Sequence, residues 1–396
     1  MSNAAVDSLT RKDFPQAIID QVETPCYLIS EDVVRRNCEL LDEVSRRTGA
    51  EILLALKAFA LPALFPLISG YLSGVCASGP IEAQLGAEEF GGQVHTYAPA
   101  FSGDQMKRVV HYSDYVIFNS ISQLNTHLDA VSSGQRNSGL KVGLRVNPGY
   151  AEVEVDLYNP CLPGSRFGLL PHHLEGVDLS RVSGLHFHAL CEQNADVLCR
   201  VLAAFEERFG KYLSRMEWVN FGGGHHITRS DYDVDLLCRT ITDFRKRHGQ
   251  IKVFLEPGEA VVLNAGVFVT SVLDLIDNGI EIAVVDSSAE THLPDVLGMP
   301  YRPHAVGSGD SGEYPYNYRL GGISCLAGDI IGDYSFSTPL QTGSRLVLTD
   351  MALYSFVKNT TFNGVELPRI YTFSGQKGRP VCVKSFGYGD YKSRLG

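Results

Sequence analysis

Eight short apolar or β-branched runs recur between residues 51 and 256, and this rhythm constrains the fold more than any other feature of the sequence. Stretches with helical spacing separate most of them, such as residues 80–90, 103–111 and 195–209. Several runs are apolar on both faces, as parallel strands are when helices cover one side and a core fills the other. Eight βα units predict an α/β fold, a TIM (β/α)8 barrel. The runs span residues 51–56, 73–78, 93–97, 114–118, 141–146, 183–188, 217–221 and 252–256.

A second domain is predicted beyond the last of these runs. The sequence there is strand-like, with Gly, Pro and Asn between the runs and weak helical periodicity. The segment TPCYLIS, residues 24–30, precedes the first barrel run and is expected to pair with this second domain. We therefore expect a barrel over residues 30–265 and a mostly β domain built from residues 1–29 and 266–396. A doubly wound open sheet is the alternative that the rhythm alone leaves open.

The composition limits the kinds of partner and the cellular compartment that we expect for this protein. Acidic residues outnumber basic ones by 45 to 34, which gives a net charge of −11, so we expect no nucleic-acid partner. No apolar run reaches the roughly 18 residues of a membrane span, and the first residues lack a signal-peptide pattern, so we expect no membrane association. Nine scattered cysteines without a C-x-x-C pair predict a reduced, cytoplasmic protein with no disulfide and no structural zinc.

Polar residues stand where the predicted barrel strands end, and the carboxyl ends of the strands are where such barrels have their active sites. Lys57 ends the first run, and His186 and His188 end the sixth. Three glycines, Gly222, Gly223 and Gly224, follow the seventh run and are called the glycine loop below. Glu256 ends the eighth run.

Each of these features allows two interpretations. Lys57 has apolar neighbours on both sides, and a desolvated lysine is an amine nucleophile able to form a Schiff base; alternatively, it extends from a strand end into solvent. The glycine loop exposes backbone N–H groups of the kind that bind phosphate, and phosphate sites of this fold favour the loops after strands seven and eight; alternatively, it is a tight turn.

The histidines and the glutamate are also ambiguous. His186 and His188 alternate on one strand and so face the same side, where they would bind a metal, stack on a flat cofactor ring, or be ordinary core histidines. Glu256 is predicted to be a buried carboxylate that needs a partner, either a protonated ring nitrogen or an arginine of the barrel. A lysine for an aldehyde, a phosphate loop and a carboxylate for a ring nitrogen together indicate pyridoxal 5'-phosphate.

The motifs of the chain resemble those of the fold-type III pyridoxal-phosphate decarboxylases, the group of diaminopimelate and ornithine decarboxylases, to which alanine racemase is more distantly related. Within this group the chain is most similar to the carboxynorspermidine (carboxyspermidine) decarboxylases. The matching motifs run from residue 24 almost to the end of the chain. They are TPCYLI, LALKAFA, ASGPIEAQLG, FNSISQL, RVNPG, SRFGL, FHALCE, GGGHH, LEPGEAV, THLPD, SCLAGD, FNG and FGYGDYK.

The resemblance implies a role for each site residue. Lys57 would bind the aldehyde of the cofactor, His188 would stack on its ring, and Glu256 would pair with its ring nitrogen. The glycine loop would hold the phosphate with help from the Tyr354 hydroxyl. Cys325 would be the general acid.

The resemblance also implies an assembly and a further site residue. Cys325 would reach the site from the other subunit of a homodimer whose active sites are shared, and Arg166 in SRFGL would help to order the site.

One departure from the group concerns the substrate. Diaminopimelate and ornithine decarboxylases usually read E-P-G-R where this chain has Glu259 in the last position. An arginine suits a phosphate or carboxylate, whereas a glutamate suits an amine. In the resembling subfamily Glu259 and Asp295 face the amino groups of the substrate, and Asp329 adds a further acid. The expected substrate is therefore a carboxylated triamine, carboxynorspermidine or carboxyspermidine, with a diaminopimelate or ornithine type of substrate as the alternative; Glu259 as a helix cap is the structural alternative.

Three other functions compete with this hypothesis. A metal-dependent barrel hydrolase would use His186 and His188, but the sequence offers no convincing further ligands, so we expect no metal. A non-catalytic pyridoxal-phosphate binding protein would tolerate loss of the acid at Cys325, which here lies within an intact SCLAGD motif. A racemase is disfavoured because alanine racemases pair the ring nitrogen with arginine.

Overall fold

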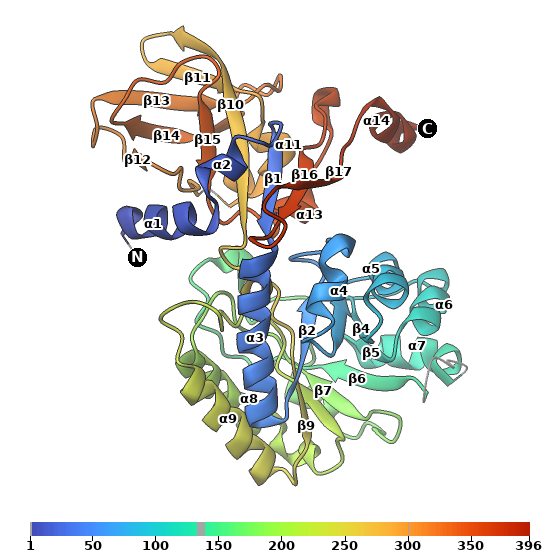
Figure 1. Cartoon of the computed structure of the whole chain (residues 1–396). Helices are drawn as coiled ribbons and strands as arrows, with labels where there is room; N and C mark the ends of the chain where they lie inside the picture. Colours follow the sequence, from blue (N-terminus) through green and yellow to red (C-terminus); the bar gives the residue numbers. More distant parts are fainter. Residues whose placement is uncertain (1, 133–138, 300) are drawn as a thin grey trace. The chain divides into compact units, whose positions relative to one another are not determined.

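The computed structural model describes residues 2–132, 139–299 and 301–396 and divides the chain into two compact units (Figure 1). The first, called the barrel unit, is Arg36–Val261. The second, called the sheet unit, combines both ends of the chain, Met1–Arg35 and Val262–Gly396.

The barrel unit contains a closed barrel of parallel strands in chain order, which confirms the predicted (β/α)8 fold and excludes the open sheet. Each of the eight predicted runs holds one of its strands. Most strand positions are buried, because helices cover the outside and side chains fill the inside. The strands are β2 (Glu51–Ala55), β3 (Gly74–Ala77), β4 (Gln93–Tyr97), β5 (Tyr115–Phe118), β6 (Lys141–Arg145), β7 (Gly184–His186), β8 (Trp218–Asn220) and β9 (Lys252–Leu255).

Amphipathic helices alternate with these strands and lie around the outside of the barrel (Figure 1). The longest within the unit, α8, buries Leu198, Val201, Leu202 and Phe205 along one stripe. The helices are α3 (Glu31–Thr48), which begins in the sheet unit, α4 (Phe65–Ile68), α5 (Pro80–Leu85), α6 (Gly103–Tyr112), α7 (Ile121–Ser132), α8 (Ala195–Leu213), α9 (Val234–Arg247) and α10 (Glu259–Val262), with short turns η1 (Pro62–Leu64), η2 (Gly86–Phe90), η3 (Asp156–Tyr158) and η4 (Pro171–Leu174).

The interior of the barrel is organised around Trp218, the single tryptophan of the chain. Its indole lies over two strands that carry no side chain at this level: a Cβ on Gly184 of β7 would stand 2.0 Å from the indole, and one on Gly143 of β6 would stand 2.3 Å from it. The indole N–H donates to Ser183 Oγ over 3.1 Å. The two glycines therefore create the space that the largest side chain of the barrel fills.

The sheet unit is a mixed sheet in the order β12-β14-β13-β11-β10-β1-β16-β17, with β15 paired to β10. The N-terminal segment belongs to this sheet, because β1 pairs antiparallel with β10 and parallel with β16. The strands are β1 (Cys26–Ser30), β10 (Gly266–Asp277), β11 (Glu281–Val285), β12 (Ser308–Gly309), β13 (Tyr316–Gly321), β14 (Ile330–Phe336), β15 (Arg345–Leu348), β16 (Arg369–Phe373) and β17 (Val381–Lys384). The helices are α1 (Asn3–Asp13), α2 (Gln16–Ile19), α11 (Ala289–His292), α12 (Pro294–Gly298), α13 (Ser355–Lys358), α14 (Tyr388–Leu395) and the turn η5 (Phe362–Gly364).

Two apolar clusters flank the central strands of the sheet unit. Tyr27 and Phe268 belong to one cluster, whereas their neighbours Leu28 and Val267 belong to the other. Successive side chains of a strand point to opposite faces, so each central strand contributes to both cores.

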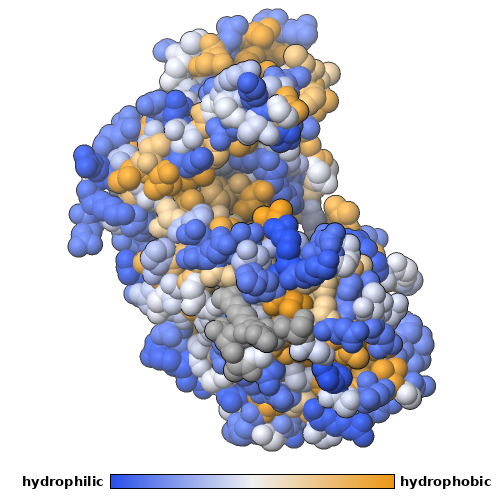
Figure 2. All heavy atoms as spheres, turned by 90° about the vertical axis from the view of Figure 1, so that its right-hand side faces the viewer, coloured by the Kyte–Doolittle hydropathy of each residue, from blue (hydrophilic) through white to orange (hydrophobic). Residues whose placement is uncertain are grey.

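The surface is mainly polar on the face that Figure 2 shows, with apolar residues scattered among hydrophilic ones. Among the described residues, no helix combines the length and the apolar character that a membrane crossing requires.

Candidate active site

Polar side chains gather where the barrel strands end. Lys57 follows β2, Arg145 ends β6, His186 ends β7, Asn220 ends β8 and Glu256 follows β9. Because the strands are parallel, these ends share one rim, the position of the active site in barrel enzymes. Sequence reasoning missed Arg145 and Asn220, although the same rule would have found them, since each is a polar residue at the end of an apolar run.

Lys57 lies in the turn after β2, between the buried residues Leu56 and Ala58. Its side chain is exposed, so the prediction of a lysine desolvated by its apolar neighbours is wrong for the chain by itself. The strand ends at Ala55, and the turn that follows directs the neighbours into the core but the amine away from it. The amine is therefore accessible to an aldehyde at the rim.

Glu256 is held by two neighbouring strand ends. Asn220 Nδ2 donates to Glu256 Oε1 over 2.7 Å, and His186 Nε2 lies 3.3 Å from Glu256 Oε2. Burial alone would raise the pKa of Glu256, but the hydrogen bonds from His186 and from the Asn220 amide keep this pKa below its usual value. We call these three residues the carboxylate clamp; it presents an ionised carboxylate at neutral pH, and its partners are a histidine and an amide, not the arginine that the alternative interpretation required.

The glycine loop is shaped by close backbone contacts. A Cβ on Gly222 would stand 2.5 Å from Phe187 O, and one on Gly224 would stand 2.1 Å from Leu190 O; both residues also have positive φ. Contrary to the expectation of bare donors, the N–H of Gly222 donates to Asn220 Oδ1 and that of Gly223 to His188 Nδ1. In this structure the loop positions the clamp and His188, and its contact with a phosphate stays a prediction.

His188 presents a neutral imidazole at the rim. Its Nδ1 accepts the Gly223 N–H over 2.8 Å, which places its own proton on Nε2. Burial, followed by the charges of Lys57 and Arg145, keeps the pKa of His188 well below its usual value. A neutral, flat ring fixed in this way fits the expected stacking on a cofactor ring.

The two histidines at the end of the sixth run bond different partners. His186 directs Nε2 to Glu256, whereas His188 uses Nδ1 on the glycine loop. Among the described residues, a different set brings three ligand atoms within 4.8 Å of one another: Glu192, His226 and Glu259. The hydrolase hypothesis therefore loses the geometry that motivated it.

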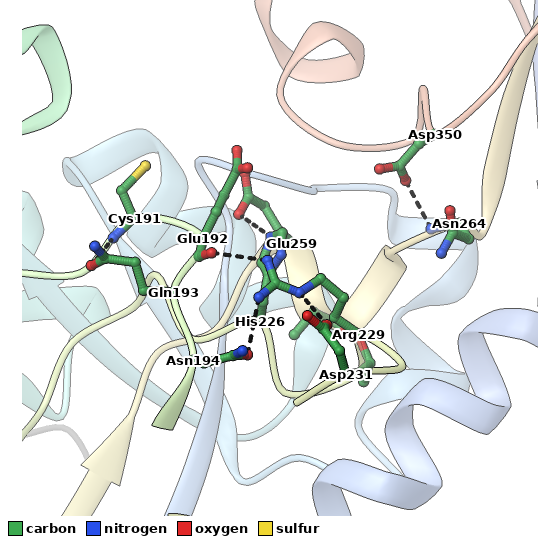
Figure 3. A network of polar contacts seen from close by, with 12 residues as sticks. Cys191, Glu192, Gln193, Asn194, His226, Arg229, Asp231, Glu259, Asn264 and Asp350 are labelled. Atoms are coloured by element: carbon green, nitrogen blue, oxygen red, sulfur yellow. Dashed lines mark hydrogen bonds and ion pairs between the residues drawn. The ribbon is translucent and has the colours of Figure 1, made fainter. Parts of the chain in front are cut away.

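Glu259 begins α10 and belongs to an acidic group at the barrel rim (Figure 3). His226 Nε2 lies 2.9 Å from Glu259 Oε2, and the Glu259 side chain is only 13% exposed. Glu192, which sequence reasoning missed, faces the same place; burial and the charge of Glu259 raise its pKa. We call Glu192 and Glu259 the acidic pair. Two like charges held this close favour a cation between them.

Arg166 and Arg145 both lie over the aromatic ring of Phe167. The guanidinium carbons of Arg166 and Arg145 are 4.3 Å and 4.5 Å from the centroid of Phe167. Arg166 is exposed, and its carbonyl accepts Asn119 Nδ2 over 2.7 Å. Arg145 is 5% exposed and also lies over the ring of Tyr97. The ordering role of Arg166 stays a prediction, and Arg145 is the buried cation of the rim.

The remaining predicted residues belong to the sheet unit. Cys325 is exposed in the loop between β13 and β14, where its N–H donates to Asn363 Oδ1. Asp295 Oδ1 accepts Lys358 Nζ over 2.6 Å. Tyr354 precedes α13 with a positive φ of 37° and is half-buried.

Asp329 differs from the expectation of an acid that meets the substrate. It is 4% exposed, and its carboxylate accepts the backbone N–H groups of Ala289, Glu290 and Ser324. It thereby joins the start of α11 to the loop of Cys325. The geometry gives Asp329 a structural task, which the sequence pattern alone does not distinguish from substrate binding.

These features define a class of protein. An accessible amine, an ionised carboxylate and a neutral imidazole on the rim of a (β/α)8 barrel are the groups that a pyridine aldehyde cofactor needs: Lys57 for the aldehyde, Glu256 for the ring nitrogen and His188 for the ring face. The fold and site therefore correspond to the barrel class of pyridoxal-phosphate enzymes.

Comparisons with known proteins agree with this class. The family described as "Pyridoxal-dependent decarboxylase, C-terminal sheet domain" matches residues 26–352. The carboxynorspermidine/carboxyspermidine decarboxylase of Campylobacter jejuni subsp. jejuni is 41% identical, over 95% of this chain and 99% of its own. The carboxyaminopropylagmatine decarboxylase of Synechocystis sp. is 40% identical, over 96% of this chain and 97% of its own. A crystal structure of carboxynorspermidine decarboxylase complexed with norspermidine, from Campylobacter jejuni, is 39% identical, with a TM-score of 0.86 over 94% of this chain and all of the other.

The chain belongs to the pyridoxal-dependent decarboxylases. Its cofactor is pyridoxal 5'-phosphate, and it is a carboxy-lyase that depends on this cofactor.

Proposed function

We propose that the enzyme removes the carboxylate of carboxynorspermidine and carboxyspermidine and so forms norspermidine and spermidine in polyamine biosynthesis. The observation that carries the proposal is the acidic pair at the barrel rim. The names of the Campylobacter relatives support it independently.

The acidic pair suits the distal part of such a substrate. Glu192 and Glu259 offer two carboxylates to a protonated amine, and His226 holds one oxygen of Glu259 in place. Burial and the charge of Glu259 raise the pKa of Glu192, and a cation between the two glutamates would offset the repulsion between them. Diaminopimelate carries a carboxylate at its distal end, which the acidic pair would repel. Asp295 is proposed as a second acid for the amino groups of the triamine.

The residues of the barrel unit perform distinct tasks in the reaction. When bound, the cofactor supplies the electron sink that accepts the electron pair left by loss of carbon dioxide. The Lys57 amine would bind its aldehyde and release the product amine, and Glu256 would keep its ring nitrogen protonated. His188 would contact the ring. By holding the distal amines, the acidic pair would orient the substrate for loss of its carboxylate.

Residues of the sheet unit are proposed to complete the site across a homodimer. The thiol of Cys325, from the partner subunit, delivers a proton to the carbon that lost the carboxylate, and Tyr354 contacts the phosphate beside the glycine loop. The exposure of Cys325 supports a role outside its own unit. Mixing a Lys57→Ala protein with a Cys325→Ala protein tests the arrangement: shared sites regain activity in the hybrid dimer, whereas sites contained within one subunit do not.

A substrate panel tests the proposed specificity. Carboxynorspermidine, carboxyspermidine, carboxyaminopropylagmatine, diaminopimelate and ornithine are compared by kcat/KM. We expect the two carboxylated triamines to have the highest kcat/KM values. A preference for carboxyaminopropylagmatine, as the name of the Synechocystis relative suggests, or for diaminopimelate or ornithine would overturn the proposal.

Variants that remove one charge test whether the acidic pair binds the amines of the substrate. Glu259→Gln and Glu192→Gln should raise KM for the triamines by about 10- to 100-fold, as expected for the loss of a charged hydrogen bond. Glu88→Gln, an exposed glutamate of η2, is the matched control and should change nothing. An unchanged KM in both rim variants would contradict the role of the acidic pair.

The covalent step has its own test. Borohydride reduction of the cofactor-loaded protein should attach the cofactor to the peptide that contains Lys57, as detected by mass spectrometry. A Lys57→Ala protein that turned over at a near-normal rate would remove this mechanism. All nine cysteines are free thiols, which supports the further proposal that the enzyme works in the reducing cytoplasm.

A further inference from the structure

The carboxylate clamp contains a histidine that the mechanism above does not use. His186, Asn220 and Glu256 stand at the ends of β7, β8 and β9, three adjacent strands, and His186 and Asn220 are direct neighbours in the ladder. The side chain of His186 is 3% exposed and that of Glu256 is 12% exposed. The question is what a buried histidine contributes to a carboxylate that already has an amide partner.

The hydrogen-bond directions in the clamp are fixed by its neighbours. Asn220 Oδ1 accepts the N–H of Gly222, so the amide NH₂ must face Glu256. An ionised carboxylate only accepts, so His186 Nε2 carries the proton and donates it. The other ring nitrogen, His186 Nδ1, is buried without a hydrogen-bond partner among the described residues, so a second proton there would have no acceptor. A leucine would fill this space without that cost, so packing alone does not explain a histidine here.

Other rim groups keep His186 uncharged. Burial lowers the pKa of His186, Glu256 partly opposes this, and the charges of Arg145 and Lys57 lower it further. The thiol of Cys76 also faces Glu256, and burial and Glu256 raise its pKa, so it stays protonated as well. The titratable and aromatic groups that face the clamp from the packed elements are Lys57, Cys76, His95, Tyr97, Arg145, His188 and His225.

We propose that His186 is a positioning residue that fixes both oxygens of Glu256 for the ring nitrogen of the cofactor without neutralising the carboxylate. Asn220 alone holds one oxygen and leaves the carboxylate free to rotate. A lysine or arginine in place of His186 would hold the second oxygen but would form an ion pair and weaken the negative charge that keeps the ring nitrogen protonated. A neutral donor such as His186 holds the second oxygen of Glu256 and leaves the negative charge of the carboxylate undiminished.

The experiment measures the cofactor before it measures turnover. The protein is loaded with pyridoxal phosphate labelled with ¹⁵N in the ring, and the ¹⁵N chemical shift reports whether that nitrogen is protonated. We expect a protonated nitrogen in the wild type and a shift toward the unprotonated position in His186→Leu. In the same variant kcat should fall roughly 10- to 100-fold, while KM stays within a few-fold. This fall corresponds to the loss of one hydrogen bond to a charged group, since each factor of ten in rate equals about 1.4 kcal/mol.

Two further variants separate donation from packing. His186→Gln restores a neutral N–H donor and should recover the wild-type ¹⁵N shift and most of kcat. His127→Leu, which replaces a buried histidine of α7 that bonds Phe101 O, is the matched control and should alter neither readout. If circular dichroism shows that His186→Leu does not fold, His186→Asn, too short to reach Glu256, takes its place with the same expectations.

Two results would overturn the inference: a folded His186→Leu or His186→Asn protein with a wild-type ¹⁵N shift, or a folded His186→Gln protein no better than His186→Leu. The inference rests on the cofactor and not on the substrate of the proposed function. The ¹⁵N readout needs no substrate, so a wrong triamine assignment would appear in the substrate panel and leave this result unchanged.

Discussion

Replacing Gly184 by alanine is expected to destabilise the barrel unit because the new methyl group has no space. Its Cβ would stand 2.0, 2.1 and 2.5 Å from three atoms of the Trp218 indole. The indole is 1% exposed and packs edge-on against Tyr115 and Phe254, at 5.4 and 6.0 Å between ring centroids. These neighbours leave no space into which the indole could move. Overpacking of a core costs about 1–3 kcal/mol of stability. Because the Trp218 indole cannot move, we expect the cost at Gly184 to lie at or above the upper end of this range.

The assay uses the single tryptophan as its own probe. Trp218 fluorescence during urea unfolding reports the barrel unit, and Gly184→Ala should lower the free energy of unfolding by about 3 kcal/mol. Gly210→Ala is the matched control: it lies in α8 with nothing within 4 Å of the added Cβ, so it should stabilise by about 0.5–1 kcal/mol. The double variant Gly184→Ala, Trp218→Phe, followed by circular dichroism, should cost less than the sum of its parts. If Gly184→Ala were as stable as the wild type, the packing argument would be refuted.

Two further predictions concern pH and Asp329. Burial lowers the pKa of His95 to about 3 and those of His225 and His292 to about 4. The contribution of these neutral histidines to stability is complete above a pH of about 6.5, their pKa in the unfolded chain, and is lost as the pH falls toward 4. The unfolding free energy should therefore drop by up to about 4 kcal/mol per pH unit between these two pH values. Urea midpoints that stay constant from pH 7 to 5 would contradict this. Asp329→Asn should lower the unfolding free energy of the sheet unit by about 2–3 kcal/mol, because asparagine has one acceptor oxygen and its NH₂ group cannot accept the N–H donors that face the other oxygen of Asp329. A changed KM at unchanged stability, measured by urea unfolding and kinetics, would instead support the original expectation of substrate contact.

The barrel was predictable because its signal is local. Each apolar run is bounded by polar residues, and the structure places one strand in each. Strands β13 and β14 gave no comparable signal, because exposed and half-buried positions, glycines and charged residues interrupt their buried positions. Their pairing depends on each other and on β11, which is information that a short sequence window does not contain.

Within the site, sequence reasoning identified residue types but not their partners. The three glycines indicated a phosphate loop, yet two of their N–H groups bond Asn220 and His188. Asp329 looked like Asp295 in sequence, but only the fold shows that backbone donors surround one and a lysine the other. Glu192 gave no signal because its importance comes from Glu259, which is distant in sequence and near in space.

Gly258 connects the cofactor lysine to the glutamates of the rim. It lies between Glu256 and Glu259, and a Cβ there would stand 2.4 Å from Ala58 Cβ and 3.1 Å from Ala55 Cβ, in the turn that carries Lys57. The backbone of the two segments is also joined, since Ala55 N–H donates to Pro257 O over 3.3 Å. The absent side chain at Gly258 therefore sets how closely the Lys57 turn approaches the carboxylates.

A methyl group at Gly258 should displace the Lys57 turn, because both alanines are buried and cannot yield. Gly258→Ala is expected to reduce the amount of cofactor that borohydride fixes to Lys57 and to lower kcat by about tenfold or more, since a misplacement near 1 Å is that costly. Gly103→Ala, where an added Cβ meets nothing within 4 Å, should have no effect. The double variant Gly258→Ala, Ala58→Gly removes the clashing methyl group and should recover both readouts; if it recovered neither, the spacing between lysine and glutamates would not depend on this contact.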